Sequence, residues 1–261
     1  YMAKQMLKNE GINLPMITTL HGTDITLVGN HPFYKPAVTF SINKSDYVTS
    51  VSQSLKDDTL KLFKIKNKIK VIPNFIELDK VKKDPLAPCH RSVMAKENER
   101  IVTHISNFRK VKRISDIIKI FYNIQKAMPA KLMMVGDGPE KEKAEILCQE
   151  LGIHDKVIFF GNSNEIDKIL LLTDLFLLPS ETESFGLAAL EAMACGVPVI
   201  SSNSGGLPEV NFDGFSGYLS NVGDVDEMAS NAIKILKDDA VLNEFKNNAL
   251  EVAKKFDIKN I

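Results

Sequence analysis

The 261 residues include 44% hydrophobic side chains, enough for the cores of one large or two modest globular domains. The 33 basic and 33 acidic residues cancel, so the whole chain has no electrostatic preference for nucleic acid or an anionic membrane. The longest apolar stretch, residues 169–178, is far shorter than the ~20 residues of a membrane-spanning helix, and three scattered cysteines predict neither a disulfide framework nor a zinc site. We therefore expect a cytoplasmic protein without a membrane partner.

Short β-branched or aliphatic runs alternate with helical patterns, which predicts an α/β fold with parallel sheets. The first set has strands at residues 16–20, 47–51 and 69–73, a helix near 36–44 and another capped by Ser52. The chain opens on a helical pattern, so we expect residues 1–78 to be a Rossmann-like domain truncated at its amino end. A stretch rich in Pro and charge predicts a linker at residues 79–98.

The second set predicts another Rossmann-like domain over residues 99–261. Its strands are expected at residues 101–106, 130–136, 156–161, 174–180 and 198–202, followed by a polar-faced helical tail over 225–256. Right-handed crossovers place the loops after parallel strands along one edge, where ligands of open α/β sheets bind. The unusual residues of those loops are Asn107, Arg109, Gly136, Gly138, Gly161, Glu183, Gly186, Gly205 and Gly206.

One of these loops carries an acidic motif, PSETESFGLAALEAMACG. Gly186 lets a ligand approach the backbone, and a helix from Leu187 would offer unpaired N–H groups to a phosphate. Glu191 lies two helical turns after Glu183, within reach of the ribose of a bound nucleotide. The alternative interpretation is that Glu183 complements the helix dipole and Glu191 is a solvated helix position.

A second loop, THISNFRKVKRISD, gathers cations that suit a diphosphate, although a solvated basic loop is also compatible with this pattern. His21 follows a strand of the first domain and could touch a ligand, whereas the other histidines are expected to be structural. The turn GDGPEK has Lys141 at the last position of a dinucleotide fingerprint, so that fingerprint is incomplete. No spacing predicts a metal site or a nucleophile elbow.

Together the segments LHGTD, ISNFRKVKR, MVGDGPE, FFGN, PSETESFGLAALEAMACGVPVISSNSGGLPEV and DGFSGYL resemble the retaining GT-B glycosyltransferases with an E-x7-E motif, of the family four type. The resemblance covers essentially the whole chain. It implies a GT-B fold of two Rossmann-like domains, a UDP-sugar donor, no cofactor and no metal. The runs TLHGTDIT, INKSDYVTSVSQSLKDDT and ISNFRKVK are similar to enzymes that transfer N-acetylglucosamine from UDP-GlcNAc to L-malate, the first step of bacillithiol biosynthesis.

The resemblance also implies catalytic roles. His21 would lie near the reacting sugar, Glu183 would hold a sugar hydroxyl, and Lys112 would contact the diphosphate. Alignment on Lys112 places Asn107 where most relatives have Arg, with Arg109 two residues later, so which of the two contacts phosphate is open. The implied reaction is a front-face displacement in which the leaving diphosphate helps to take the acceptor proton.

The remaining implied contacts complete the donor and acceptor sites. Glu191 would accept the ribose hydroxyls, and Thr23 would lie beside the acceptor. The other donor-binding residues are Gly161 and Asn162, near the uracil, and Ser184, Phe185, Gly186 and Leu187, through their backbone.

Two residues depart from close relatives: Thr39 and Asn43 stand where Arg and Glu are expected. Malate carries two carboxylates and favours a cation, so other acceptors, such as a cell-wall polymer or a glycolipid, stay open. A UDP-GlcNAc 2-epimerase and a chain that binds UDP without turnover are further alternatives. A homodimer is compatible with the sequence.

Overall fold

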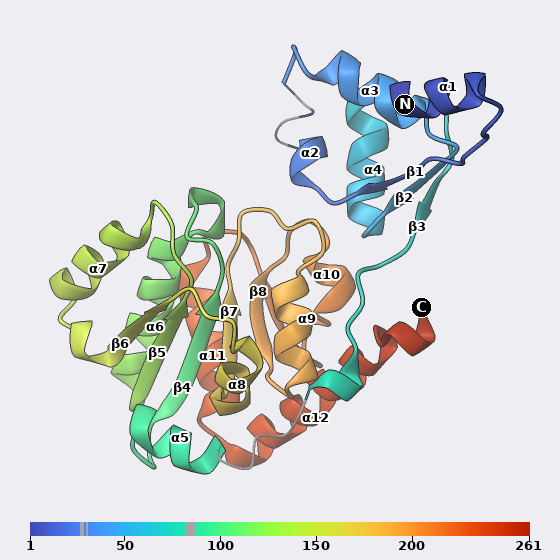
Figure 1. Cartoon of the computed structure of the whole chain (residues 1–261). Helices are drawn as coiled ribbons and strands as arrows, with labels where there is room; N and C mark the ends of the chain where they lie inside the picture. Colours follow the sequence, from blue (N-terminus) through green and yellow to red (C-terminus); the bar gives the residue numbers. More distant parts are fainter. Residues whose placement is uncertain (27–28, 30, 82–86) are drawn as a thin grey trace. The chain divides into compact units, whose positions relative to one another are not determined.

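The computed structural model describes residues 1–26, 29, 31–81 and 87–261, except for the side chains of Asp24 and residues 87–90. Residues 82–86 of the predicted linker and the side chains of Cys89 and His90 thus lie outside the described residues. The described chain divides into two compact units (Figure 1). The first contains residues 1–74, 183–185 and 261, and the second contains residues 75–182 and 186–260.

The first unit contains a three-stranded parallel sheet in the order β1-β2-β3. Strands β1 (Ile17–Leu20), β2 (Tyr47–Ser50) and β3 (Ile69–Val71) confirm the three predicted strands. The helices are α1 (Met2–Asn9), α2 (Thr23–Thr26), α3 (Lys35–Asn43) and α4 (Gln53–Leu62). As predicted, Ser52 caps α4: its hydroxyl accepts a hydrogen bond from the backbone N–H of Leu55 at 3.0 Å.

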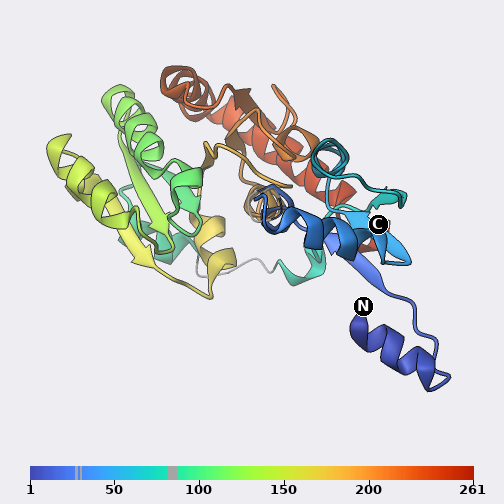
Figure 2. The same ribbon diagram turned by 90° about the horizontal axis from the view of Figure 1, so that it is seen from above.

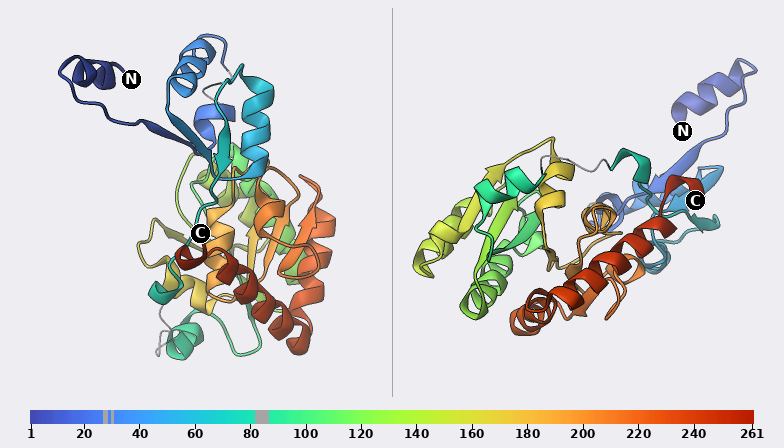
Figure 3. Two further views of the ribbon diagram at one scale, coloured as in Figure 1. Left: turned by 90° about the vertical axis from the view of Figure 1, so that its right-hand side faces the viewer. Right: turned by 90° about the horizontal axis from the view of Figure 1, so that it is seen from below.

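Helix α1 lies apart from the sheet of the first unit, as Figures 2 and 3 show, and none of its residues is buried. A Lys4–Asp46 ion pair and an edge-to-face contact between Tyr1 and Phe40, 5.5 Å between ring centroids, connect it to the unit. Few buried contacts therefore hold this helix in place.

The second unit contains a six-stranded sheet in the order β6-β5-β4-β7-β8-β9, in which every neighbouring pair is parallel. Strands β4 (Arg100–Ile105), β5 (Ala130–Val135), β6 (Val157–Gly161), β7 (Leu175–Leu178) and β8 (Val199–Ser202) confirm the predicted strands. The sixth strand, β9 (Gly217–Ser220), was not predicted because its Gly-rich sequence is typical of a turn. A Cβ at Gly217 would lie 1.7 Å from the carbonyl oxygen of Val199, so this position requires glycine.

Helices cover both faces of this sheet. Helix α6 (Ile114–Ala127) packs beside α7 (Lys141–Glu150) and α11 (Val225–Leu236), and α5 (Ala87–Met94) packs on α8 (Ile166–Leu172). Helix α12 (Asp239–Lys255) packs along α9 (Leu187–Ala194), and α10 (Leu207–Val210) is a single turn. The predicted tail is thus two helices, because Asp238 caps a new one by accepting from Ala240 N at 2.8 Å. Short 3-10 turns are η1 (Leu78–Lys80), η2 (Lys110–Lys112), η3 (His154–Lys156) and η4 (Ile258–Asn260).

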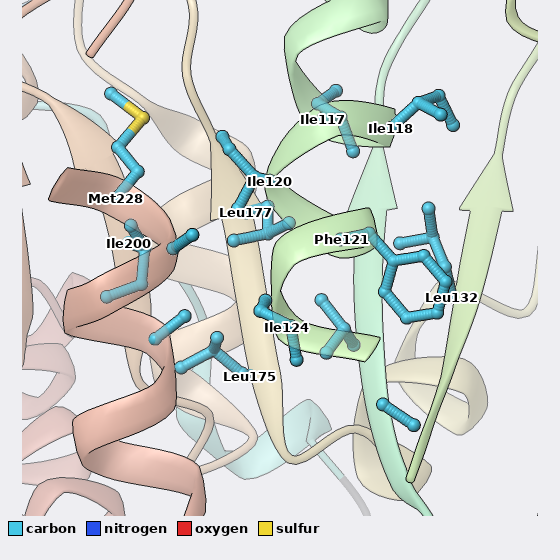
Figure 4. Close-up of a cluster of buried hydrophobic side chains, with 14 of the residues drawn as sticks. Ile117, Ile118, Ile120, Phe121, Ile124, Leu132, Leu175, Leu177, Ile200 and Met228 are labelled. Atoms are coloured by element: carbon cyan, nitrogen blue, oxygen red, sulfur yellow. The ribbon is translucent and has the colours of Figure 1, made fainter. Parts of the chain in front are cut away.

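The main core lies between α6, α11 and one face of the sheet (Figure 4). Ile117, Ile120, Phe121 and Ile124 are fully buried and recur at the i, i+3, i+4, i+7 spacing of one helix face. They meet the strand residues Leu132, Leu175, Leu177 and Ile200. The alternate strand residues Ile101, Met133 and Val135 form a second cluster with Ile169 and Leu172 of α8. Both faces are apolar, as expected of a parallel sheet covered on each side.

The described part of the predicted linker belongs to the second unit. Arg91 of α5 pairs with buried Asp174 at 2.7 Å and donates to the carbonyl of Leu172 at 2.6 Å. Asp174 also accepts from Ile101 N at 2.9 Å and pairs with Lys246 at 3.3 Å. This network fixes α5 at the amino end of β7. Among the residues described, no helix has the length and apolar character needed to cross a membrane.

Candidate functional site

The strand order of the second sheet defines where its loops separate. The chain proceeds from β4 through β5 to β6 on one side, and β7 then pairs with β4 on the other side. The strand order thus reverses between β4 and β7, and the loops that follow these two neighbouring strands both start at the carboxyl edge of the sheet. Open α/β sheets bind ligands at such a switch point. A backbone hydrogen bond of 2.8 Å from Glu181 N to Val111 O joins these loops. The predicted basic and acidic motifs thus meet at this switch point.

Glycine allows the neighbouring loops to approach closely. Gly136 directly follows β5 and adopts φ 125°, and its N–H donates to Gly161 O at 2.8 Å. Gly138 has φ 155°, and a Cβ there would lie 2.8 Å from both the N and the O of Phe108. The loops after β4, β5 and β6 therefore pack backbone to backbone, which explains the glycines of the MVGDGPE segment.

The acidic motif has the predicted helix start. Helix α9 begins at Leu187, directly after Gly186, which adopts φ 98°. A Cβ on Gly186 would lie 2.7 Å from the side chain of Leu207, so the backbone passes close to α10. Phe185 is buried, whereas Glu183 and Ser184 are half-buried. The motif thus places a helix amino terminus, with exposed Leu187 as its first residue, at the carboxyl edge of the sheet, and a helix amino terminus favours anions.

Glu191 lies on α9 and is half-buried. Burial raises the pKa of its carboxyl group, and the nearby charge of Asp167 on α8 raises it further. The same causes, with Glu191 itself, raise the pKa of Cys195 to about 12, so this thiol is protonated at neutral pH. Sequence reasoning missed Asp167, because its proximity to Glu191 depends on the packing of α8.

The basic loop follows β4. Asn107 and Arg109 are exposed and Lys112 is half-buried in η2. Behind them lies fully buried His104, with Nδ1 2.8 Å from Leu177 O and Nε2 2.7 Å from the Ser106 hydroxyl.

Burial lowers the pKa of His104 to about 4, and the positive charge of Lys112 contributes to the shift. A neutral ring that donates from Nδ1 to the carbonyl and accepts at Nε2 fits both partners. His104 therefore connects β4 to β7 below the switch point, the structural role predicted for it.

The other predicted residues are divided between the units. Gly161 is the last residue of β6, with φ 67°, and Asn162 is exposed beside it. His21 and Thr23 follow β1 in the first unit, and both are exposed. The structure therefore brings Asn107, Arg109, Lys112, Gly161 and Asn162 to the same sheet edge as the start of α9, while His21 and Thr23 lie at the corresponding edge of the other sheet.

Thr39 and Asn43 have local structural partners. The Thr39 hydroxyl donates to Lys35 O at 2.7 Å, within its own helix. Asn43 donates to Lys64 O at 3.0 Å and accepts from Lys66 N at 2.7 Å, which connects α3 to the segment after α4. Both side chains thus stabilise the fold of the first unit.

Comparison with protein families gives two matches. Residues 89–252 match the model described as "Glycosyl transferases group 1", and residues 2–80 match "Glycosyltransferase Family 4". N-acetyl-alpha-D-glucosaminyl L-malate synthase of Bacillus anthracis is 43% identical over 251 residues, which cover 96% of this chain and 65% of that protein. An uncharacterized glycosyltransferase of Methanocaldococcus jannaschii is 30% identical over 95% of this chain and 67% of its own length. The chain thus spans about two thirds of the length of these curated relatives.

Solved structures match both sheets. The Anabaena protein HepE, in complex with UDP and glucose, has a TM-score of 0.83 at 23% identity, over 93% of this chain and 67% of that one. Sucrose-phosphate synthase of Thermosynechococcus elongatus has a TM-score of 0.82 at 23% identity, over 98% of this chain and 67% of that one. The predicted GT-B fold is confirmed. By its motifs, its fold and a family match that extends over most of its length, this chain belongs to the group 1 glycosyl transferases.

Proposed function

We propose that the protein is a retaining glycosyltransferase that transfers N-acetylglucosamine from UDP-GlcNAc to L-malate, the first step of bacillithiol biosynthesis. The observation that carries the proposal is the 43% identity to the Bacillus anthracis L-malate synthase over 96% of this chain. A cytoplasmic location, expected from the cysteine pattern, is part of the same proposal.

The second unit, together with the segment 183–185 that directly precedes α9, is proposed to hold the donor. The backbone of residues 184–187 faces the diphosphate at the amino end of α9, where the helix dipole favours an anion, and Lys112 adds a full positive charge. Glu191 accepts the ribose hydroxyls, and its partial burial strengthens these hydrogen bonds. Glu183 holds a hydroxyl of the sugar, and Gly161 and Asn162 border the uracil.

The first unit is proposed to hold the acceptor, with Thr23 beside it. Residues 1–74 contain 10 Lys, no Arg and 5 Asp or Glu, a net charge of +5, while the rest of the chain carries −5. Although the whole chain is neutral, residues 1–74 are therefore basic, and a basic surface favours an anionic acceptor such as a dicarboxylate.

In the proposed reaction the malate hydroxyl oxygen bonds to the anomeric carbon on the face from which the UDP oxygen departs. The proton of the hydroxyl passes to the leaving diphosphate. Negative charge develops on that diphosphate, where Lys112 and the start of α9 stabilise it without rearrangement. His21 contacts the reacting sugar. No protein nucleophile takes part, and the proposal needs no metal.

The test is to incubate full-length protein with UDP-GlcNAc and L-malate. We expect release of UDP and an α-linked product, at a rate that excess EDTA leaves unchanged. Turnover with a glycolipid or polysaccharide but not with malate would favour the alternative acceptors. Exchange of the sugar C2 proton with solvent deuterium, without acceptor, would instead identify an epimerase.

A further inference from the structure

Arg113 has an unusual backbone. Among the described residues it is the one non-glycine with positive φ, at φ 53° and ψ 47°, in the left-handed region. A Cβ disfavours this conformation, so a residue other than glycine adopts it only where surrounding contacts hold it there. Arg113 stands between η2, which contains Lys112, and the first turn of α6.

Three sets of contacts hold Arg113. Its Nε donates to the Asp116 carboxylate at 2.5 Å, and Asp116 is buried. Its N–H donates to Lys110 O at 2.9 Å, while its carbonyl accepts from Asp116 N at 2.8 Å. Its guanidinium lies against Gly223, where an added Cβ would come within 3.0 Å of Nη2. The side chain is therefore clamped between α6 and the loop before α11.

This clamp fixes the turn that carries Lys112. The N–H of Lys112 donates to Arg109 O at 2.9 Å, and the carbonyl of Val111 accepts from Glu181 N at 2.8 Å. The carbonyl of Val111 thus connects the turn to the loop after β7, and Arg113 fixes the end of the turn that leads into α6. Arg113 joins Lys112 to α6, so the φ and ψ angles of Arg113 set the orientation of Lys112 relative to α6.

We propose that Arg113 is a positioning residue: its ion pair with Asp116 locks the left-handed turn and so aims the ammonium group of Lys112 at a bound nucleoside diphosphate. The inference rests on the proposed function, because Lys112 has this role only if the second unit binds UDP. Arg113 itself does not contact the diphosphate, since Asp116 engages its guanidinium.

The test is a double-mutant cycle, with UDP affinity measured by titration calorimetry on the full chain. Arg113→Gly keeps a backbone that accepts positive φ and removes the clamp, and Asp116→Asn removes the charge of the partner. We expect each to weaken UDP binding about 10-fold, and Lys112→Ala to weaken it at least as much. Arg113→Gly added to Lys112→Ala should cause no further loss, because the clamp acts through Lys112.

Thermal unfolding separates positioning from structural support. Glycine removes the backbone strain but leaves buried Asp116 without its cation, so the melting temperature of Arg113→Gly should fall. Adding Asp116→Asn removes that unpaired charge and should recover part of the melting temperature, while UDP binding stays weakened. Normal UDP affinity in Arg113→Gly, alongside a weakened Lys112→Ala, would overturn the inference and leave the proposed function standing. Multiplicative losses in the double variant would also overturn it. Failure of the unmodified chain to bind UDP would overturn both.

Discussion

The buried His104 predicts a loss of stability in mild acid. In the folded chain its pKa falls from the ordinary 6.5 to about 4, mainly through burial and also through the charge of Lys112. The unfolded chain therefore binds a proton as the pH falls through about 6.5, while the folded chain resists protonation until about pH 4. Stability from this group is complete above the unfolded pKa and is lost as the pH falls toward the folded pKa.

The magnitude follows from the shift. At ~1.4 kcal/mol per pKa unit, a shift from 6.5 to about 4 gives a total of about 3 kcal/mol, of which about 2 kcal/mol is lost between about pH 7.5 and pH 5. Urea unfolding followed by circular dichroism, repeated across this range, measures the loss. The control is His104→Gln, which cannot titrate.

We expect His104→Gln to be less stable at pH 7.5, because glutamine cannot make both ring hydrogen bonds to Leu177 and Ser106. Its stability should, however, change less between pH 7.5 and pH 5 than that of the unmodified chain. Parallel pH profiles for the two proteins would refute the inference that His104 is buried and neutral.

Two further predictions concern residues that stabilise the second unit. Gly138→Ala should destabilise the second unit by about 3 kcal/mol in urea unfolding, because its Cβ would lie 2.8 Å from backbone atoms of Phe108. The control is Gly152→Ala, which should cost about 1 kcal/mol, because its φ is also positive but the space around its Cβ is open. Equal losses would contradict the packing of the loops. Asp174→Asn should cost about 3 kcal/mol because it leaves two cations without their buried partner, yet leave UDP affinity unchanged. The control Asp239→Asn, which breaks an exposed ion pair with Arg100, should destabilise the chain less than Asp174→Asn. A change in UDP affinity on Asp174→Asn would contradict the position of Asp174 at the amino edge of the sheet, opposite the proposed site.

Strand positions were predictable because their β-branched and aliphatic runs fit strands buried on both faces. The start of α9 was predictable for a similar local reason: Gly186 allows a turn that other residues resist, and the small residues after it favour a helix. The capping of α4 by Ser52 is another local signal that the structure confirms.

Other features depend on tertiary contacts that leave no local pattern. Strand β9 is set by the approach of Gly217 to β8, although its sequence is typical of a turn. The effect of Asp167 on Glu191 follows from the packing of α8. The sequence shows Arg113 only as one cation of the basic loop THISNFRKVKRISD, because positive φ is normally marked by Gly or Asn. The contacts that permit it lie in α6 and beside Gly223.

The central claim is that the second unit binds a UDP-sugar with its ribose on Glu191. The most direct test is calorimetric titration of UDP into the full chain and into Glu191→Ala, with exposed Glu244→Ala on α12 as the matched control. Loss of a carboxylate that accepts two ribose hydroxyls should weaken binding by about 3 kcal/mol, roughly 100-fold, while the control binds like the unmodified chain. Equal affinity of Glu191→Ala and the unmodified chain would contradict the claim.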